Sequence, residues 1–233
     1  MVKEGYYFGL PPFLLGLLSL SFGTPLTIGV GVVLVCFALF VFYFFRNPER
    51  EIPVEPSAVV APGDGRVVVV KDEPYNGQPG KRISIFLAVW NVHVNRSPAA
   101  GTITRLEYKP GKFMAAWAEN ASIDNEQNIF TLASEHGEIV FKQIAGLIAR
   151  RVVSWKKSGD TVARGERIGL VRFGSRVDLW MPADAEIAVR VGQNVKGGST
   201  VVARMAAAVP KRSASPLPSK SASQKLAEQE GGA

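Results

Sequence analysis

The N-terminal part of the chain is a long apolar block, residues 8–45, that contains no charged residue. Its second half, LTIGVGVVLVCFALFVFYFF (residues 26–45), would form a helix of about 30 Å, which matches the hydrocarbon core of a bilayer. The first half, residues 8–22, is shorter and contains Pro11 and Pro12. It is either the first helix of a hairpin that turns at FGTP or a segment lying in the membrane interface. Residues 1–45 therefore predict a membrane anchor with one or two spans.

The apolar block does not have the features of a cleaved signal peptide. It is too long, and it lacks a cleavage site of the A-x-A type. Lys3 precedes the block, and Arg46 and Arg50 follow it. Positive residues beside a membrane segment favour the cytoplasmic side. We therefore expect the protein in the cell (inner) membrane, with the remaining chain on the cytoplasmic side.

Beyond residue 45 the pattern changes to short alternating runs separated by Gly- and Pro-containing turns such as PGDG, NGQPG and KSGD. The runs predict strands at residues 66–70, 82–90, 102–108, 129–134, 137–146, 151–155, 167–173, 176–180 and 186–191. Only residues 112–120 indicate a short helix. Residues 46–209 thus predict a mainly β (β-rich α+β) domain of sandwich or barrel type. Residues 210–233 are rich in Ser, Ala, Pro and Lys and predict a disordered tail.

Two stretches, VVAPGDGRVVVV and KKSGDTVARGERIGLVRF, resemble the turns of lipoyl-type barrel-sandwich hybrids. A lipoyl carrier needs a lysine at an exposed hairpin tip, and the corresponding hairpin here, VDLWMPADAEI, has none. The resemblance therefore favours the barrel-sandwich strand arrangement more than a carrier function.

Composition narrows the choice of partners. The net charge of +7 and the pI near 9.6 favour an acidic partner, either nucleic acid or an anionic membrane. The apolar block decides for the membrane, so no nucleic acid is expected. A single cysteine, Cys36, excludes an internal disulfide and a multi-cysteine metal site. The two histidines, His93 and His136, are too few for a His-rich metal cluster, and we expect no metal.

Three polar residues could form an activated-nucleophile system. Asp64 lies in the turn APGDGRV, His93 follows a strongly apolar strand, and Ser175 follows Gly174 in VRFGSRVDLW. In such a system a base takes the hydroxyl proton and a carboxylate orients the base. Each residue alone is more typical of a turn or a satisfied core position, and their spacing does not show that they meet.

Five motifs together resemble the phosphatidylserine decarboxylase proenzymes in their short, archaeal-like form. These motifs are FFRNPER, APGDGRV, NVHVNRSP, QIAGLIARR and GERIGLVRFGSRVDL, and the resemblance covers about residues 44–192. It implies that the Gly174–Ser175 bond breaks itself. Ser175 would attack the carbonyl of Gly174, and elimination from the resulting ester would leave a covalent pyruvoyl cofactor at residue 175.

The same resemblance implies the reaction and the roles of the residues. The pyruvoyl ketone would form a Schiff base with the amine of phosphatidylserine, and loss of CO2 would give phosphatidylethanolamine. His93 would be the base for self-cleavage, and Asp64 would hold its tautomer. A decarboxylase of a related lipid such as archaetidylserine and a non-catalytic, membrane-anchored lipoyl-like module are the alternatives.

Several assignments stay open at this level. Longer bacterial relatives have a second histidine where this chain has Trp90, so the group that returns the proton is undetermined, and His93 is one candidate. The phosphate could contact any of Arg46, Arg50, Arg96 and Arg176. His136 fits a solvated turn residue.

Cleavage would give two chains, residues 1–174 and 175–233, which should stay together as a heterodimer through shared strands; further oligomerisation is open. All the predicted strands and the three polar residues lie beyond Arg46. We therefore expect the domain to fold and cleave itself without residues 1–45.

Overall fold

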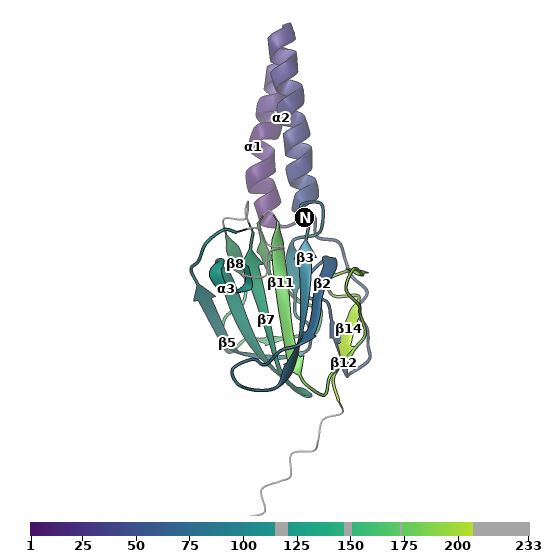
Figure 1. Ribbon diagram of the computed structural model, residues 1–233. Coiled ribbons are helices and arrows are strands. Elements are labelled where there is room, and N and C mark those ends of the chain that lie inside the picture. The colour runs from purple at the N-terminus through teal and green to yellow at the C-terminus, as the bar shows by residue number, and fades with distance from the viewer. Residues whose placement is uncertain (115–120, 147–150, 173, 207–233) are drawn as a thin grey trace, which may run out of the picture.

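The computed structural model describes residues 1–114, 121–146, 151–172 and 174–206. It has a β-rich domain from one end of which a helical hairpin projects (Figure 1). The predicted tail, residues 210–233, lies outside the described residues.

The hairpin is made of α1 (Lys3–Ser21) and α2 (Pro25–Phe44). Two glycines allow the helices to approach closely, since a Cβ on Gly16 would lie 3.0 Å from the Gly31 carbonyl oxygen. Within the described residues, α2 is the one helix long and apolar enough to cross a membrane. Its mean hydropathy is 2.6, and 17% of its apolar window is buried. The low burial distinguishes α2 from the core helix of a soluble domain.

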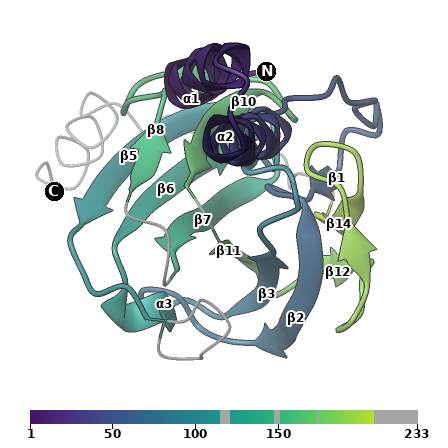
Figure 2. The ribbon, with the colours of Figure 1, turned by 90° about the horizontal axis from the view of Figure 1, so that it is seen from above.

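The domain is built on an antiparallel sheet of eight strands that curves around the core (Figure 2). The strand order is β13 (Asn194–Val195), β2 (Gly65–Asp72), β3 (Gly80–Leu87), β11 (Ser175–Pro182), β7 (Gly137–Ala145), β6 (Gln127–Ser134), β5 (Gly101–Lys109) and β9 (Thr161–Val162). The strand that begins at Ser175 therefore lies inside the sheet, with a hydrogen-bonded neighbour on each side.

Two three-stranded sheets complete the domain. One has the order β4 (Val94–Arg96), β10 (Arg167–Val171) and β8 (Val152–Ser154), and the other has the order β1 (Ala58–Val60), β14 (Val201–Arg204) and β12 (Glu186–Ile187). A short helix, α3 (Ala121–Asp124), precedes β6. In the β4–β10–β8 sheet, the start of β4, next to His93, lies beside the end of β10, which precedes Gly174.

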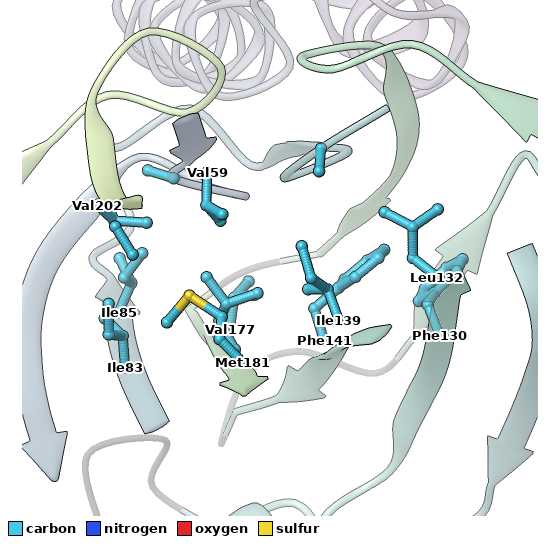
Figure 3. Close-up of a cluster of buried hydrophobic side chains, with 14 of the residues drawn as sticks. Val59, Ile83, Ile85, Phe130, Leu132, Ile139, Phe141, Val177, Met181 and Val202 are labelled. Atoms are coloured by element: carbon cyan, nitrogen blue, oxygen red, sulfur yellow. The ribbon is translucent and has the colours of Figure 1, made fainter. Parts of the chain in front are cut away.

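Aliphatic and aromatic side chains from the concave face of the large sheet fill the core with those of the small sheets (Figure 3). The rings of Phe130 and Phe141 stack with centroids 4.5 Å apart. On β11 the residues alternate, so that Val177, Leu179 and Met181 enter this core. A one-residue shift of β11 would turn this apolar set away from the core, so the register at Ser175 is strongly specified.

The prediction of a mainly β domain with an N-terminal apolar helix is confirmed. The first apolar segment forms a hairpin helix, not a separate interfacial segment, and it begins at Lys3. Strand β3 ends at Leu87, whereas the predicted strand extended to residue 90. In the predicted helix at 112–120, residues 112–114 are not helical, and the rest lie outside the described residues.

The sequence did not predict the short strands β1, β4, β9 and β13, because two or three residues are too few to show a period.

Candidate active site

The predicted cleavage site lies where β11 begins, at the end of the sheet that faces the hairpin (Figure 1). Gly174 has a φ of 67°, a left-handed conformation that strains residues with a Cβ. Apart from its chain neighbours, no described residue has an atom within 4 Å of the position that a Cβ would occupy there. Glycine is thus favoured at residue 174 by backbone conformation, and the space beside it is open.

Ser175 is fully buried, opposite Leu87 of β3 and Ala145 of β7. Its Oγ has no hydrogen-bond partner among the described residues. A buried hydroxyl without a partner is costly, and such groups concentrate where chemistry requires them. The fully buried, unpartnered hydroxyl next to a glycine with open space is consistent with a nucleophile attacking the preceding carbonyl.

His93 lies directly before β4, and its ring contacts the cleavage site. The backbone amide of Gly174 donates a hydrogen bond to Nε2 over 3.3 Å. Nδ1 lies 3.0 Å from the Asn91 carbonyl oxygen and donates to it. These two partners fix the tautomer, with the proton on Nδ1 and the lone pair of Nε2 directed at the residue that precedes Ser175.

The pKa of His93 is lowered from 6.5 to about 4, mainly by burial; the bond to Asn91 opposes this shift, and the positive charge of Arg46 adds to it. The ring is therefore neutral at pH 7. A neutral imidazole can accept a proton, so the protonation state of His93 suits a general base.

Asp64 does not orient His93 in the uncleaved chain, and this expectation is corrected. Its carboxylate pairs with Arg50 over 2.7 Å and accepts a hydrogen bond from the backbone amide of Gly197 over 2.8 Å. Both ring nitrogens of His93 have other partners, and the Asn91 carbonyl takes the place predicted for the carboxylate. Asp64 instead connects the segment after the hairpin to the turn that precedes β14.

Three of the four arginines considered for the lipid phosphate are used within the domain. Arg50 pairs with Asp64, Arg96 donates to backbone carbonyls, and Arg176 is buried against Asp178. Their charges are therefore compensated or enclosed before a substrate arrives.

Arg46 differs from these three arginines. It follows α2, stacks on the ring of Tyr43 at 3.8 Å and donates to the carbonyl of Trp90 over 2.7 Å. No carboxylate pairs with it in the described part of the chain. The side chain of Trp90 is 66% exposed beside this group. An exposed Trp, a Tyr and an Arg at the end of an apolar helix are typical of a membrane–water interface.

A sequence model of phosphatidylserine decarboxylase matches residues 37–203. The chain is 50% identical to the phosphatidylserine decarboxylase proenzyme of Solibacter usitatus over 204 residues, which cover 88% of this chain and 96% of that protein. It is 48% identical to the proenzyme of Symbiobacterium thermophilum over 180 residues, 76% of this chain and 84% of the relative.

This chain belongs to the phosphatidylserine decarboxylase family.

The proenzyme of Neisseria meningitidis serogroup B is 45% identical over 77% of this chain but is covered only to 69% of its own length. The family therefore includes longer members, whereas this chain is close in extent to the Solibacter relative. These relatives are bacterial, so the comparisons support family membership without an archaeal-like subtype.

The family match begins at residue 37, inside α2, so the end of the predicted anchor lies within the region that the decarboxylase model matches. The sequence analysis included Phe44 in the motif FFRNPER but gave it no role in the site. Phe44 of α2 lies against His93, with ring centroids 4.2 Å apart. In the sequence Phe44 stands among several aromatic residues of an apolar block, and periodicity does not separate a site residue from a lipid-facing one.

Proposed function

We propose that the protein is a self-processing, pyruvoyl-dependent decarboxylase that converts phosphatidylserine to phosphatidylethanolamine and CO2. The observation that carries the proposal is the contact between His93 Nε2 and the Gly174 amide, directly beside the buried hydroxyl of Ser175, which has no hydrogen-bond partner among the described residues. Membership of the decarboxylase family supports the substrate and the reaction.

In the proposed self-cleavage, the hydrogen bond from the Gly174 amide to His93 Nε2 is replaced by one from the Ser175 hydroxyl. Nε2 then accepts the hydroxyl proton. The Oγ atom attacks the Gly174 carbonyl carbon, and the peptide C–N bond breaks as the amine of residue 175 takes up a proton. Loss of the Ser175 α-proton then expels the Gly174 carboxylate from the ester and leaves dehydroalanine. Addition of water to its imine tautomer releases ammonia and leaves the pyruvoyl group.

The position of residue 175 suits this group. After cleavage, β11 is still hydrogen-bonded to β3 and β7, so the new N-terminus stays fixed in the sheet. When formed, the group supplies an electron sink for the carbanion that remains after loss of CO2. The strands of the small chain pair with β1 and β2 as well as β3 and β7, which supports a heterodimer of the two cleavage chains.

For the substrate, we infer that Arg46 contacts the phosphate, because no carboxylate of the described residues pairs with it and it lies at the base of the hairpin. His93 is the candidate for returning the proton to Cα, since Trp90 stands in place of a second histidine. Contacts to the headgroup alone do not distinguish acyl from ether tails, so archaetidylserine remains the second candidate substrate.

The test of this function is product analysis with the full-length chain in phosphatidylserine vesicles. We expect phosphatidylethanolamine and CO2 in equal amounts, and no product from Ser175→Ala. Vesicles with the same headgroup on ether-linked archaeal lipids should react comparably if the tails are not read. A protein that cleaves itself but releases no CO2 from either lipid would contradict the proposed reaction.

We further propose that the hairpin anchors the protein in the cell membrane with the domain on the cytoplasmic side. The outward side chains of both helices are apolar and exposed, and Lys3, Arg46 and Arg50 lie at the end next to the domain. In a Cys36→Ser background, Arg105→Cys places a thiol at a site whose side chain is 69% exposed. A membrane-impermeant maleimide should label it only after the inner membrane is opened. Labelling of intact spheroplasts would instead show that the domain has the opposite orientation.

A further inference from the structure

The end of the hairpin next to the domain is part of a buried cluster. We call it the hairpin-base cluster; its buried members are Val2, Val41, Phe44 and Phe45 from the hairpin and Val92, Val94 and Leu170 from the domain. Phe44 is 0% exposed, whereas Phe37, two turns earlier on α2, is 53% exposed. The backbone amide of Val2 also donates to the Phe45 carbonyl over 3.1 Å. The hairpin is therefore packed into the domain and is more than a tether.

Residues at the base of the hairpin hold His93 in two ways. The ring of Phe44 lies over the imidazole at 4.2 Å, with 32° between the planes. The Tyr43 hydroxyl and Arg46 Nη2 both donate to the Trp90 carbonyl, over 3.3 and 2.7 Å. Trp90 precedes Asn91, whose carbonyl accepts the His93 Nδ1 proton. The last turn of α2 thus fixes the ring face of the histidine and the loop that sets its tautomer.

We propose that Phe44 is a positioning residue for His93, so that the membrane hairpin completes the self-cleavage site. The proposal rests on the role of His93 in the proposed function. The aromatic face excludes water from one side of the imidazole and limits its rotation, which keeps Nε2 directed at Gly174. Docking of the hairpin against the domain is then a condition for efficient maturation.

The electrostatic surroundings of His93 agree with this role. Water excluded by Phe44 would otherwise stabilise the imidazolium, so the contact contributes to the burial that lowers the pKa of His93. Arg46, after α2, is the charged group that acts on the ring, and it too disfavours the protonated form. The other two polar groups at the ring are uncharged: the Asn91 carbonyl, which faces Nδ1, and the amide of Gly174 before β11, which faces Nε2.

The proposal changes the expectation for a chain that begins at Arg46. Such a chain keeps every strand together with Asp64, His93 and Ser175, but it loses Phe44 and the cover of the histidine. We now expect it to cleave itself more slowly than the full chain, in contrast to the expectation drawn from the sequence.

The direct test is NMR titration of 15N-histidine in the full-length Ser175→Ala chain, which does not cleave, in lipid nanodiscs. The chain has two histidines, so His136→Asn assigns the His93 signal. Phe44→Ala should raise the His93 titration midpoint toward the ordinary value near 6.5. Phe44→Leu, which keeps apolar volume, should raise it less, and the matched control Phe37→Ala should leave it unchanged.

Self-cleavage of chains that retain Ser175 gives the second readout. Phe44→Ala should cleave roughly tenfold more slowly at pH 8, with a larger loss at pH 5 where the uncovered histidine is protonated. Phe37→Ala should match the wild type at both pH values. An unchanged His93 midpoint in a folded Phe44→Ala or Phe44→Leu chain would overturn the proposal. If the wild type fails to cleave, the proposed function fails, while the titration still reports on the contact with Phe44.

Discussion

The Ser175→Ala protein should remain one chain of 233 residues, whereas the wild-type protein should separate into chains of residues 1–174 and 175–233. The reason is that Ser175 Oγ is the only atom of the proposed site that becomes bonded to the Gly174 carbonyl carbon. Intact-mass spectrometry of the purified proteins measures this directly. The substitution removes one buried hydroxyl that has no hydrogen-bond partner in the described part of the chain, so it should not impair folding.

A matched control is Ser199→Ala, a serine of the same small chain that lies in the turn before β14. It should cleave like the wild type. The wild-type small chain should also resist Edman degradation, because a pyruvoyl group has no amine. A free serine amine at residue 175 would show that an external protease makes the cut, and the self-processing account would then fail.

Replacement of His93 should have the second largest effect. His93→Gln retains an amide that can bond to Gly174 but cannot act as a base, so self-cleavage should slow by roughly 10² to 10⁴-fold. A time course on denaturing gels after cell-free synthesis in nanodiscs measures the rate. His136→Gln is the matched control. His136 precedes Gly137 at the start of β7, and Ala145 at the other end of that strand pairs with Ser175, roughly 25 Å away.

The His136→Gln chain should therefore cleave at the wild-type rate. Cleavage of the His93→Gln chain at that same rate would remove His93 from its role as the base. In that case the contact between its Nε2 and the Gly174 amide would be structural only.

The pKa of His93 also predicts how His93→Gln changes the dependence of stability on pH. The folded-state pKa near 4 lies below the unfolded value near 6.5, so the unfolded chain binds more protons between these pH values. The stability contribution is therefore fully present above about pH 6.5 and is lost as the pH falls toward 4, by about 3 kcal/mol in total. In Ser175→Ala chains followed by denaturant unfolding, His93→Gln should remove this part of the acid destabilisation.

The hydrophobic pattern alone predicted the main helix of the proposed anchor. The absence of charge over residues 8–45 and the length of the second half predicted a membrane-compatible helix, and α2 has both properties. The pattern did not decide whether the first half forms a second hairpin helix. The packing of Gly16 against Gly31 decides that point, since it depends on the shape of two helices together.

The longer strands of the large sheet were also predictable, because short alternating or apolar runs bounded by Gly- and Pro-containing turns indicate strands. Strands β9 and β13, of two residues each, were not predicted. The set of family-like motifs further singled out Gly174, Ser175 and His93, and the structure brings these three together through the Gly174 amide and Nε2. Local sequence determined these elements because each is encoded within a few consecutive residues.

Only the tertiary structure decided which groups surround the histidine. Asp64 was the predicted partner, yet its carboxylate is taken by Arg50 and Gly197, and a backbone carbonyl at Asn91 holds Nδ1. Phe44 covers the ring from a helix that the sequence assigns to the membrane. The sequence by itself determined the apolar helix, the longer strands and the Gly174–Ser175 pair that is proposed as the cleavage site. The partners of His93 depend on chain segments far apart in sequence, whose meeting is fixed by packing and not by any local pattern.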